Sequence, residues 1–233
     1  MSKQFVTESV MADAFGECLR SGVFASFPSF DSVYREVVCQ QGIADFITTV
    51  NIRSQAPNID KIDSLQRASE TSIRILSLLK RASPRSMEHL IKKSGLTDQT
   101  VMRALSHLMA DGMITKTDSG NYLLSNAWYM HPVQLWAFEL KLTDWRRALF
   151  QALQCKAFAT CVVTVFPMER RKLLELHLDK FRTMRVGVML FDTYTHDYHV
   201  LLRPLKSRPA SHMHYLYAFS QIASMSIQEL SNP

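Results

Sequence analysis

Residues 133–153 read VQLWAFELKLTDWRRALFQAL, an apolar run that is followed at once by an amphipathic one. The first half is predicted to be a strand, in which successive side chains point to opposite faces of the sheet. Phe138 and Leu140 therefore share one face. Glu139 and Lys141 then share the second face. Two charges in an apolar strand are costly unless they pair or meet a metal. They indicate either a functional pair or an edge strand with one face in water.

The rest of the C-terminal half alternates strands with helices. Strands are predicted at 133–142, 159–167, 185–192 and 199–202, and helices at 143–153, 168–183 and 211–226. Because a β-α-β-α-β succession places helices over a sheet with parallel strands, the sequence predicts an α/β (α+β) fold with a mixed sheet.

Length and composition set further limits. A chain of 233 residues with 47% hydrophobic content can bury one large core or two smaller ones. It has no apolar run of membrane-spanning length and no basic-then-apolar leader, so we expect a soluble cytoplasmic protein without a membrane partner. The four cysteines form no CxxC pair, which suits a reducing compartment.

Charge is distributed unevenly along the chain. Residues 1–64 contain five Lys/Arg against eight Asp/Glu, whereas residues 65–125 contain nine against five and residues 126–233 thirteen against eight. The whole chain has a net charge of +6 and a pI near 9.2. The basic excess after residue 64 favours a polyanionic partner such as DNA.

The N-terminal segment is predicted to hold two helices and a strand. The helices are expected at 5–21 and 33–38, and the second contains Glu36. The run 43–50 has the β-branched content of a strand, and Asp45 is its one charge. A polar connector follows at 51–64.

A different module follows this connector. Helices are predicted at 71–82, 86–94 and 97–112, and a hairpin at 113–124 with its turn at Thr117-Asp118-Ser119-Gly120. The segment LIKKSGLTDQTVMRALSHLMADGMITKTDSGNYLLS (90–125) has the short helix, glycine turn, longer helix and wing of the winged helix-turn-helix family. Residues 65–127 therefore resemble that family.

The resemblance implies a DNA-binding surface. If the third helix enters a major groove, its exposed N-terminal side chains meet bases and nearby lysines meet phosphates. The base-contacting candidates are Asp98, Gln99, Thr100 and Arg103, and the phosphate-contacting candidates are Lys92, Lys93 and Lys116. The alternative is a module for protein binding or dimerisation.

A second resemblance joins the segments on either side of this module. A carboxylate at Glu36, a strand with Asp45, the triplet Glu139-Leu140-Lys141 and a helix with Gln151 are similar to the PD-(D/E)xK nuclease superfamily, interrupted by an inserted domain. This implies a restriction-endonuclease-like core from residues 1–50 and 128–233, the last part including a C-terminal helix. Residues 51–127 then form the linker and the winged helix.

The nuclease resemblance also implies a role for each site residue. Mg²⁺ or Mn²⁺ would be bound by Asp45 and Glu139 with Glu36 as an auxiliary ligand, while Lys141 would stabilise charge on the phosphate. Gln151 matches a helical glutamine of one branch, in which the residue four positions later is usually Tyr. Here that position is Cys155.

Two functional classes remain open from the sequence. The chain is either a metal-dependent DNA endonuclease or nuclease subunit, acting in phage defence or DNA processing, or a winged-helix regulator whose nuclease-like part is a non-cutting scaffold. The pairs His196/His199 and His212/His214 could hold zinc, but ordinary surface histidines explain them better. A second copy of the chain or a larger complex is a further candidate partner.

Overall fold

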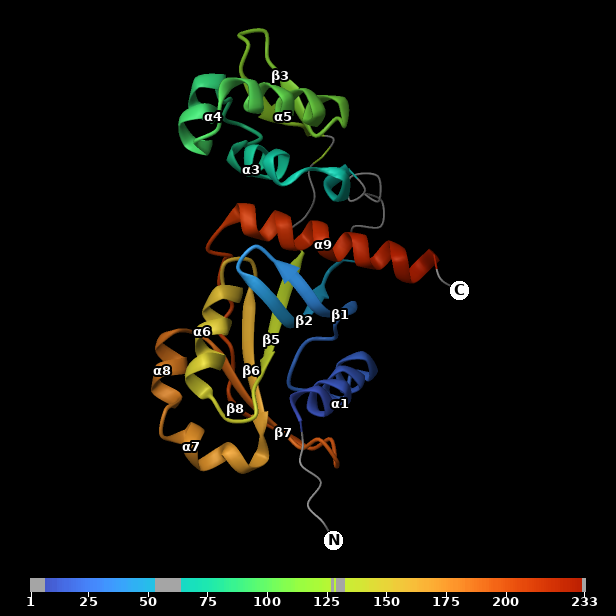
Figure 1. Cartoon of the computed structure of the whole chain (residues 1–233), viewed down its shortest axis with the longest axis vertical. Coiled ribbons are helices and arrows are strands. Elements are labelled where there is room, and N and C mark those ends of the chain that lie inside the picture. Colours follow the sequence, from blue (N-terminus) through green and yellow to red (C-terminus); the bar gives the residue numbers. More distant parts are fainter. Residues whose placement is uncertain (1–6, 53–63, 127, 129–132, 232–233) are drawn as a thin grey trace. The chain divides into compact units, whose positions relative to one another are not determined.

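The computed structural model describes the backbone of residues 7–52, 64–126, 128 and 133–231, and the side chains up to residue 225. The chain divides into two compact units (Figure 1). The first consists of residues 1–53 and 133–211, and the second of residues 54–132 and 212–233. The described part of the chain contains no helix that is both long and apolar enough to cross a membrane.

The first unit is built on a six-stranded mixed sheet in the order β1-β2-β5-β6-β7-β8. The strands are β1 (Ser32–Cys39), β2 (Gly42–Val50), β5 (Gln134–Leu140), β6 (Cys161–Pro167), β7 (Gly187–Phe191) and β8 (Tyr198–Leu202). Strands β5, β6 and β7 are parallel to one another, and the other neighbours are antiparallel. The predicted α+β class with a mixed sheet is confirmed.

Helices cover both faces of this sheet (Figure 1). Helix α1 (Glu8–Ser21) lies on one face, and α6 (Trp145–Cys155), α7 (Arg171–Glu175) and α8 (Leu178–Thr183) lie on the other. The single helix predicted at 168–183 is instead a 3₁₀ turn, η2 (Met168–Arg170), followed by α7 and α8. A turn at Leu176-His177 separates α7 from α8.

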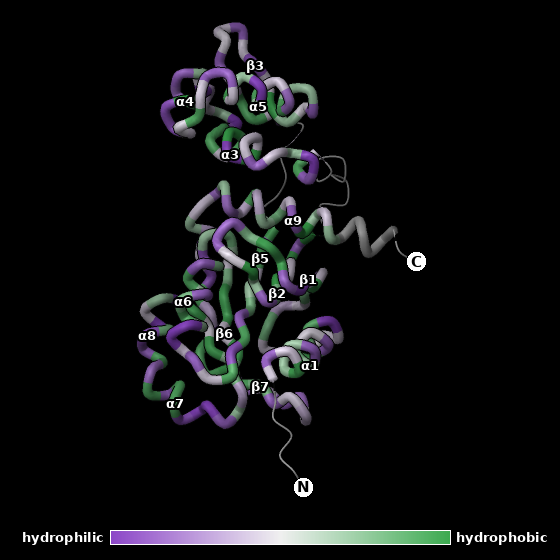
Figure 2. The backbone as a smooth tube through the Cα atoms, in the orientation of Figure 1, coloured by the Kyte–Doolittle hydropathy of each residue, from purple (hydrophilic) through white to green (hydrophobic). Residues whose placement is uncertain are grey.

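A cluster of phenylalanines holds α1 on the sheet. The ring of Phe15 lies 5.1–5.7 Å from the rings of Phe24, Phe46, Phe138 and Phe191, measured between centroids. Strand alternation places Phe46 and Phe138 on this face, as the sequence pattern predicts. Hydrophobic residues concentrate in the strands accordingly (Figure 2).

The start of β7 packs against the chain after β8 too closely for a side chain. A Cβ atom added to Gly187 would lie 2.9 Å from Cδ of Pro204 and 3.0 Å from its backbone nitrogen. We expect Gly187→Ala to lower the free energy of unfolding by about 1–3 kcal/mol, because the proline ring cannot rotate away. Urea unfolding of both proteins checks this, and equal midpoints would contradict the close packing.

The helix predicted at 33–38 is wrong, because this segment is strand β1. It pairs with β2 through the tight turn at Gln40-Gln41, with Arg35 opposite Phe46 and Val37 opposite Ala44. The valines at 33, 37 and 38 suit a strand better than a helix. Glu36 has φ of 52°, which interrupts the regular pairing of β1.

The second unit has the three helices and hairpin that the sequence predicts. They are α3 (Glu70–Leu78), α4 (Met87–Ser94), α5 (Asp98–Ala110), β3 (Ile114–Lys116) and β4 (Tyr122–Leu124). Hydroxyls of Ser69, Ser86 and Thr97 cap the three helix N-termini. Gly95 ends α4 in the left-handed conformation, with φ of 66°, which makes the tight turn into α5.

The last helix, α9 (His212–Ser231), groups with the second unit. It packs along α3, and Nδ1 of His212 lies 3.3 Å from the carbonyl oxygen of Ser77. The sequence predicts that residues 212–233 belong to the nuclease-like core, so the observed grouping differs there. The packing of α9 on α3 accounts for the difference, since α9 adds to the cover that α4 and α5 give to α3.

Candidate functional site

The first candidate site lies where β2 and β5 separate in the first unit. The two strands pair from Phe46 opposite Phe138 to Val50 opposite Gln134, so Asp45 and Glu139 follow at the end of this pairing. Oδ2 of Asp45 accepts a hydrogen bond of 2.7 Å from the backbone N–H of Leu140. The structure therefore places the two carboxylates, which are 94 positions apart in sequence, on adjacent strands.

Glu139 is buried, with 1% of its surface exposed, on the face that α6 covers. Its Oε1 accepts a hydrogen bond of 3.1 Å from the thiol of Cys155, while Oε2 is buried without a partner among the described residues. Gln151, Gln154 and Cys155 line the same small pocket. Cys155 thus contacts Glu139 at the position where the nuclease branch of the predicted resemblance usually has Tyr.

Burial and charge repulsion act together on the two carboxylates. Burial, reinforced by the negative charge of Asp45, raises the pKa of Glu139 to about 8. Burial also raises the pKa of Asp45, although the Leu140 hydrogen bond and Lys141 oppose that rise. A cation bound between the two carboxylates would favour their ionised forms and so offset both the burial and the mutual repulsion.

Lys141 points toward α1. Its Nζ lies 3.1 Å from Oε2 of Glu8, and Oε1 of Glu8 accepts a hydrogen bond of 3.4 Å from the backbone N–H of Leu142. Glu8 was not predicted as a site residue, because its place in the first turn of α1 reads in the sequence as ordinary helix stabilisation.

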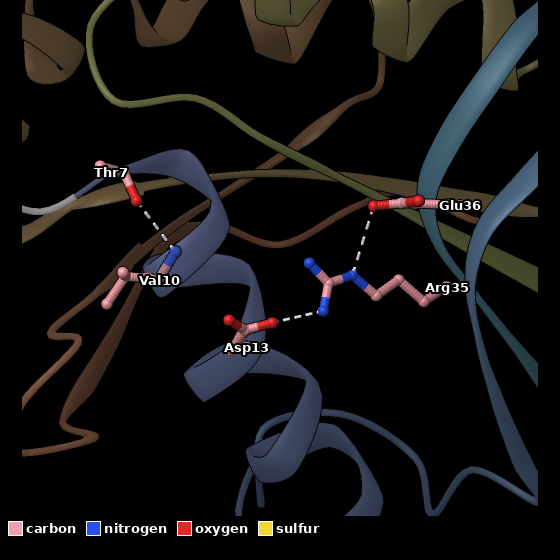
Figure 3. A network of polar contacts seen from close by, with 5 residues as sticks. All are labelled: Thr7, Val10, Asp13, Arg35 and Glu36. Atoms are coloured by element: carbon pink, nitrogen blue, oxygen red, sulfur yellow. Dashed lines mark hydrogen bonds and ion pairs between the residues drawn. The ribbon is translucent and has the colours of Figure 1, made fainter.

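A cleft of about 200 Å³ opens between α1 and the sheet, lined by Glu8, Arg35, Glu36 and Asp45 among others. Figure 3 shows Arg35 ion-paired to Asp13 of α1, with its Nε 3.6 Å from Oε1 of Glu36. The positive φ of Glu36 explains why two successive residues both face the cleft. Glu36 therefore reaches the site region from a strand.

Asp45 and Glu139 fit a divalent cation in part. The unpartnered Oε2 of Glu139 and the raised pKa of both groups suit a bound cation. Within the described residues, however, no three carboxylate, histidine or cysteine side chains come together as ligands, so Glu36 does not complete a set. Mg²⁺ commonly takes only one or two carboxylates and keeps several waters, so the two remain suitable ligands.

The raised pKa of Glu139 gives stability a pH dependence. The pKa of Glu139 is about 8 in the folded protein and near 4.5 in the unfolded chain. Its contribution to the free energy of unfolding is therefore fully present below pH 4.5 and is lost as the pH rises through 8. We expect Glu139→Gln to remove that loss and stabilise the protein by a few kcal/mol at pH 9, at about 1.4 kcal/mol per pKa unit.

Urea unfolding at pH 5 and pH 9 measures this effect, with Glu17→Gln on the exposed face of α1 as the control. The control should keep the wild-type pH dependence. If Glu139→Gln keeps it too, Glu139 is ionised in the folded protein.

The second candidate site is the exposed face of α5 in the second unit. Val101, Leu105 and Leu108 are buried against the other helices. The opposite face exposes Asp98, Gln99 and Arg103 among the predicted residues, together with Met102 and Ser106. Lys92 and Lys93 are exposed in the last turn of α4, directly before the Gly95 turn.

Two predicted contacts have local partners. The hydroxyl of Thr100 lies 2.8 Å from that of Thr97, so it takes part in capping α5 and is half-buried. Lys116 is exposed on the hairpin, with its Nζ 5.7 Å from the centre of the Tyr122 ring. Of the seven predicted DNA-contacting residues, Thr100 is thus the one whose side chain already serves the helix.

Helix α4, the Gly95 turn, the exposed helix α5 and the β3–β4 hairpin together make up the winged-helix module. Residues 66–121 match the MarR family. The match covers α3 through the turn of the hairpin, ends just before β4, and confirms the predicted winged helix. No curated protein and no solved structure matches the chain. The MarR-type match does not extend to the first unit, so the nuclease resemblance and its site residues stay predictions.

Proposed function

We propose that the protein is a DNA-binding regulator that docks duplex DNA through its MarR-type winged helix. The observation that carries this proposal is the match of residues 66–121 to the MarR family, whose members bind DNA and often act as dimers. The exposed polar face of α5 supplies the side chains that such docking needs. The first unit then acts as the scaffold or effector part of the regulator.

The chemistry of the exposed residues supports duplex binding. Gln99 can pair with the edge of adenine and Arg103 with the edge of guanine, since each offers two groups at the required spacing. Lys92 and Lys93 lie beside the turn that leads into α5, where a DNA backbone would pass. The exposed Met102 offers an apolar contact, which also suits a protein surface.

Selection from a pool of random duplexes tests the proposal. Full-length protein should enrich a defined sequence, because a regulator reads bases as well as phosphates. Two half-sites about one helical turn apart would indicate a dimer on the DNA. Binding without any enriched sequence, or no binding at low salt, would favour a protein-binding module.

A second candidate function is metal-dependent hydrolysis of a phosphodiester. The specific observation in its favour is the placement of Asp45 and Glu139 on adjacent strands, with Lys141 two residues after Glu139. A bound Mg²⁺ would polarise the phosphate and activate water. The residues of the chain would hold the ion, and Lys141 would neutralise phosphate charge once released from Glu8.

Plasmid and linear DNA incubated with Mg²⁺, Mn²⁺ or EDTA separate the two candidates. Cleavage that EDTA removes supports the nuclease. Intact DNA under every metal condition, combined with sequence-dependent binding, supports the regulator with a non-cutting first unit.

A further inference from the structure

A second basic surface lies on the first unit, away from the winged helix in sequence. Residues 144–185 contain nine lysines and arginines against four aspartates and glutamates, a net charge of +5 in a chain whose net charge is +6. These residues form α6, β6, η2, α7 and α8, whose helices cover one face of the sheet (Figure 1). Most of the chain's net positive charge therefore lies in one stretch of this unit.

The centre of this surface is Trp145, at the start of α6. The indole ring packs against the ring of His177, with 4.3 Å between centroids, and against Phe181 of α8. The Arg146 guanidinium carbon lies 4.7 Å from the centre of the Trp145 ring, and Nζ of Lys180 lies 5.3 Å from it. Two cations from different helices are thus held over one buried aromatic ring.

More cations adjoin this pair. Arg147 follows in the first turn of α6 with an exposed side chain. Arg170 is fixed by a hydrogen bond of 2.9 Å from its Nε to the carbonyl oxygen of Leu142, just before α6. Among the residues that the structure describes, no carboxylate forms an ion pair with Arg146, Arg147, Arg170 or Lys180.

The placement of Arg146 and Arg147 is unfavourable for the helix itself. Both lie in the first turn of α6, where backbone N–H groups carry partial positive charge, and the carboxylate at this helix end is that of the N-cap Asp144, whose Oδ1 accepts a hydrogen bond of 3.0 Å from the backbone N–H of Arg147. Two cations beside one capping carboxylate leave a net positive charge at this helix end. A bound polyanion would offset this charge and the mutual repulsion of the cations.

We infer that this surface, formed by Arg146, Arg147, Arg170 and Lys180 around Trp145, binds the phosphate backbone of the same duplex DNA that the winged helix docks. The choice of duplex DNA as the polyanion rests on the proposed function, in which the winged helix already binds duplex DNA. Phosphate contacts need no base recognition, which suits a surface of cations. Two contacting units on one chain raise the overall affinity through effective concentration.

The test compares unpaired with paired cations in the full chain. The variant Arg146→Gln/Lys180→Gln removes two unpaired cations, and the control Arg171→Gln/Arg182→Gln removes two that already pair with Glu175 and Asp179. Both change the net charge equally. Fluorescence anisotropy with a labelled duplex across a range of NaCl concentrations gives the affinity and its salt dependence.

We expect the unpaired variant to weaken binding roughly ten-fold at 150 mM salt and to lower the slope of log K against log salt by about 1.8, at about 0.9 per lost phosphate contact. The control should change the slope by much less. Arg147→Gln guards against a folding defect from the loss of contacts to Trp145, and should lower the slope by about 0.9. Equal effects in variant and control, or none in either, would overturn the inference.

The winged-helix variant Lys92→Glu/Lys93→Glu/Arg103→Glu is measured in parallel to separate the two proposals. Loss of binding in this variant alone, with a wild-type slope in Arg146→Gln/Lys180→Gln, rejects the second surface and leaves the proposed function standing. The reverse pattern rejects docking by the winged helix and keeps the surface around Trp145. Loss in both variants supports both contacts.

Discussion

Charge reversal of Lys92, Lys93 and Arg103 is expected to weaken duplex DNA binding by about a hundred-fold or more at 150 mM salt. Each side chain is exposed beside or on α5. The variant removes two phosphate contacts, those of Lys92 and Lys93, each with the release of about one counterion, and the base contact of Arg103. The slope of log K against log salt should fall by about 1.8, at about 0.9 per lost phosphate contact. A salt titration of wild type and the triple variant measures both quantities.

The matched control reverses Arg67, Arg74 and Lys80, which are exposed on or beside α3 in the same unit. It changes the net charge by the same amount but leaves α5 and the Gly95 turn untouched. The control should lose much less affinity. Equal losses would mean that overall charge, and not the winged-helix surface, determines binding.

If wild-type protein cleaves DNA with Mg²⁺, Asp45→Asn and Glu139→Gln are each expected to abolish cleavage. Each variant removes one negative charge from the pair that would hold the ion while keeping the side-chain shape. Lys141→Ala leaves both carboxylates in place, so metal binding should persist while the chemical step slows by roughly 100- to 1000-fold. Single-turnover cleavage and metal titration separate these two effects.

Glu17→Gln provides the control, since Glu17 is an exposed carboxylate of α1. Cleavage by this control but by none of the three site variants would place the chemistry at β2 and β5. Equal cleavage by all four variants would locate it elsewhere. A wild-type protein that never cuts would show that the first unit is a scaffold.

The local patterns of the sequence predict most of the fold. Alternation around Phe138 and Leu140 predicts β5 and its buried face, and the cap at Thr97 with the turn at Gly95 predicts the start of α5. These features depend on neighbouring residues, so sequence alone is sufficient. Asp45 and Glu139 are separated in sequence by the winged-helix segment, and no local pattern predicts that they lie close together. Only the nuclease resemblance predicts it.

Other features depend on tertiary contacts and escaped prediction. Residues 33–38 have too short an apolar pattern to separate helix from strand, and only pairing with β2 decides between them. Glu8 reaches Lys141 across 133 positions. Cys155 is a small apolar residue in the sequence pattern, yet its thiol contacts Glu139 because α6 lies over that part of β5.

The central claim is that the exposed face of α5 contacts DNA bases. A photo-crosslinking amino acid at Gln99, in otherwise intact full-length protein, tests it most directly when the selected duplex is added. The same group at Glu88, exposed in the first turn of α4, is the control. We predict crosslinks to the duplex from position 99 and none from position 88. Crosslinks from neither position to a duplex that the protein demonstrably binds would contradict the claim.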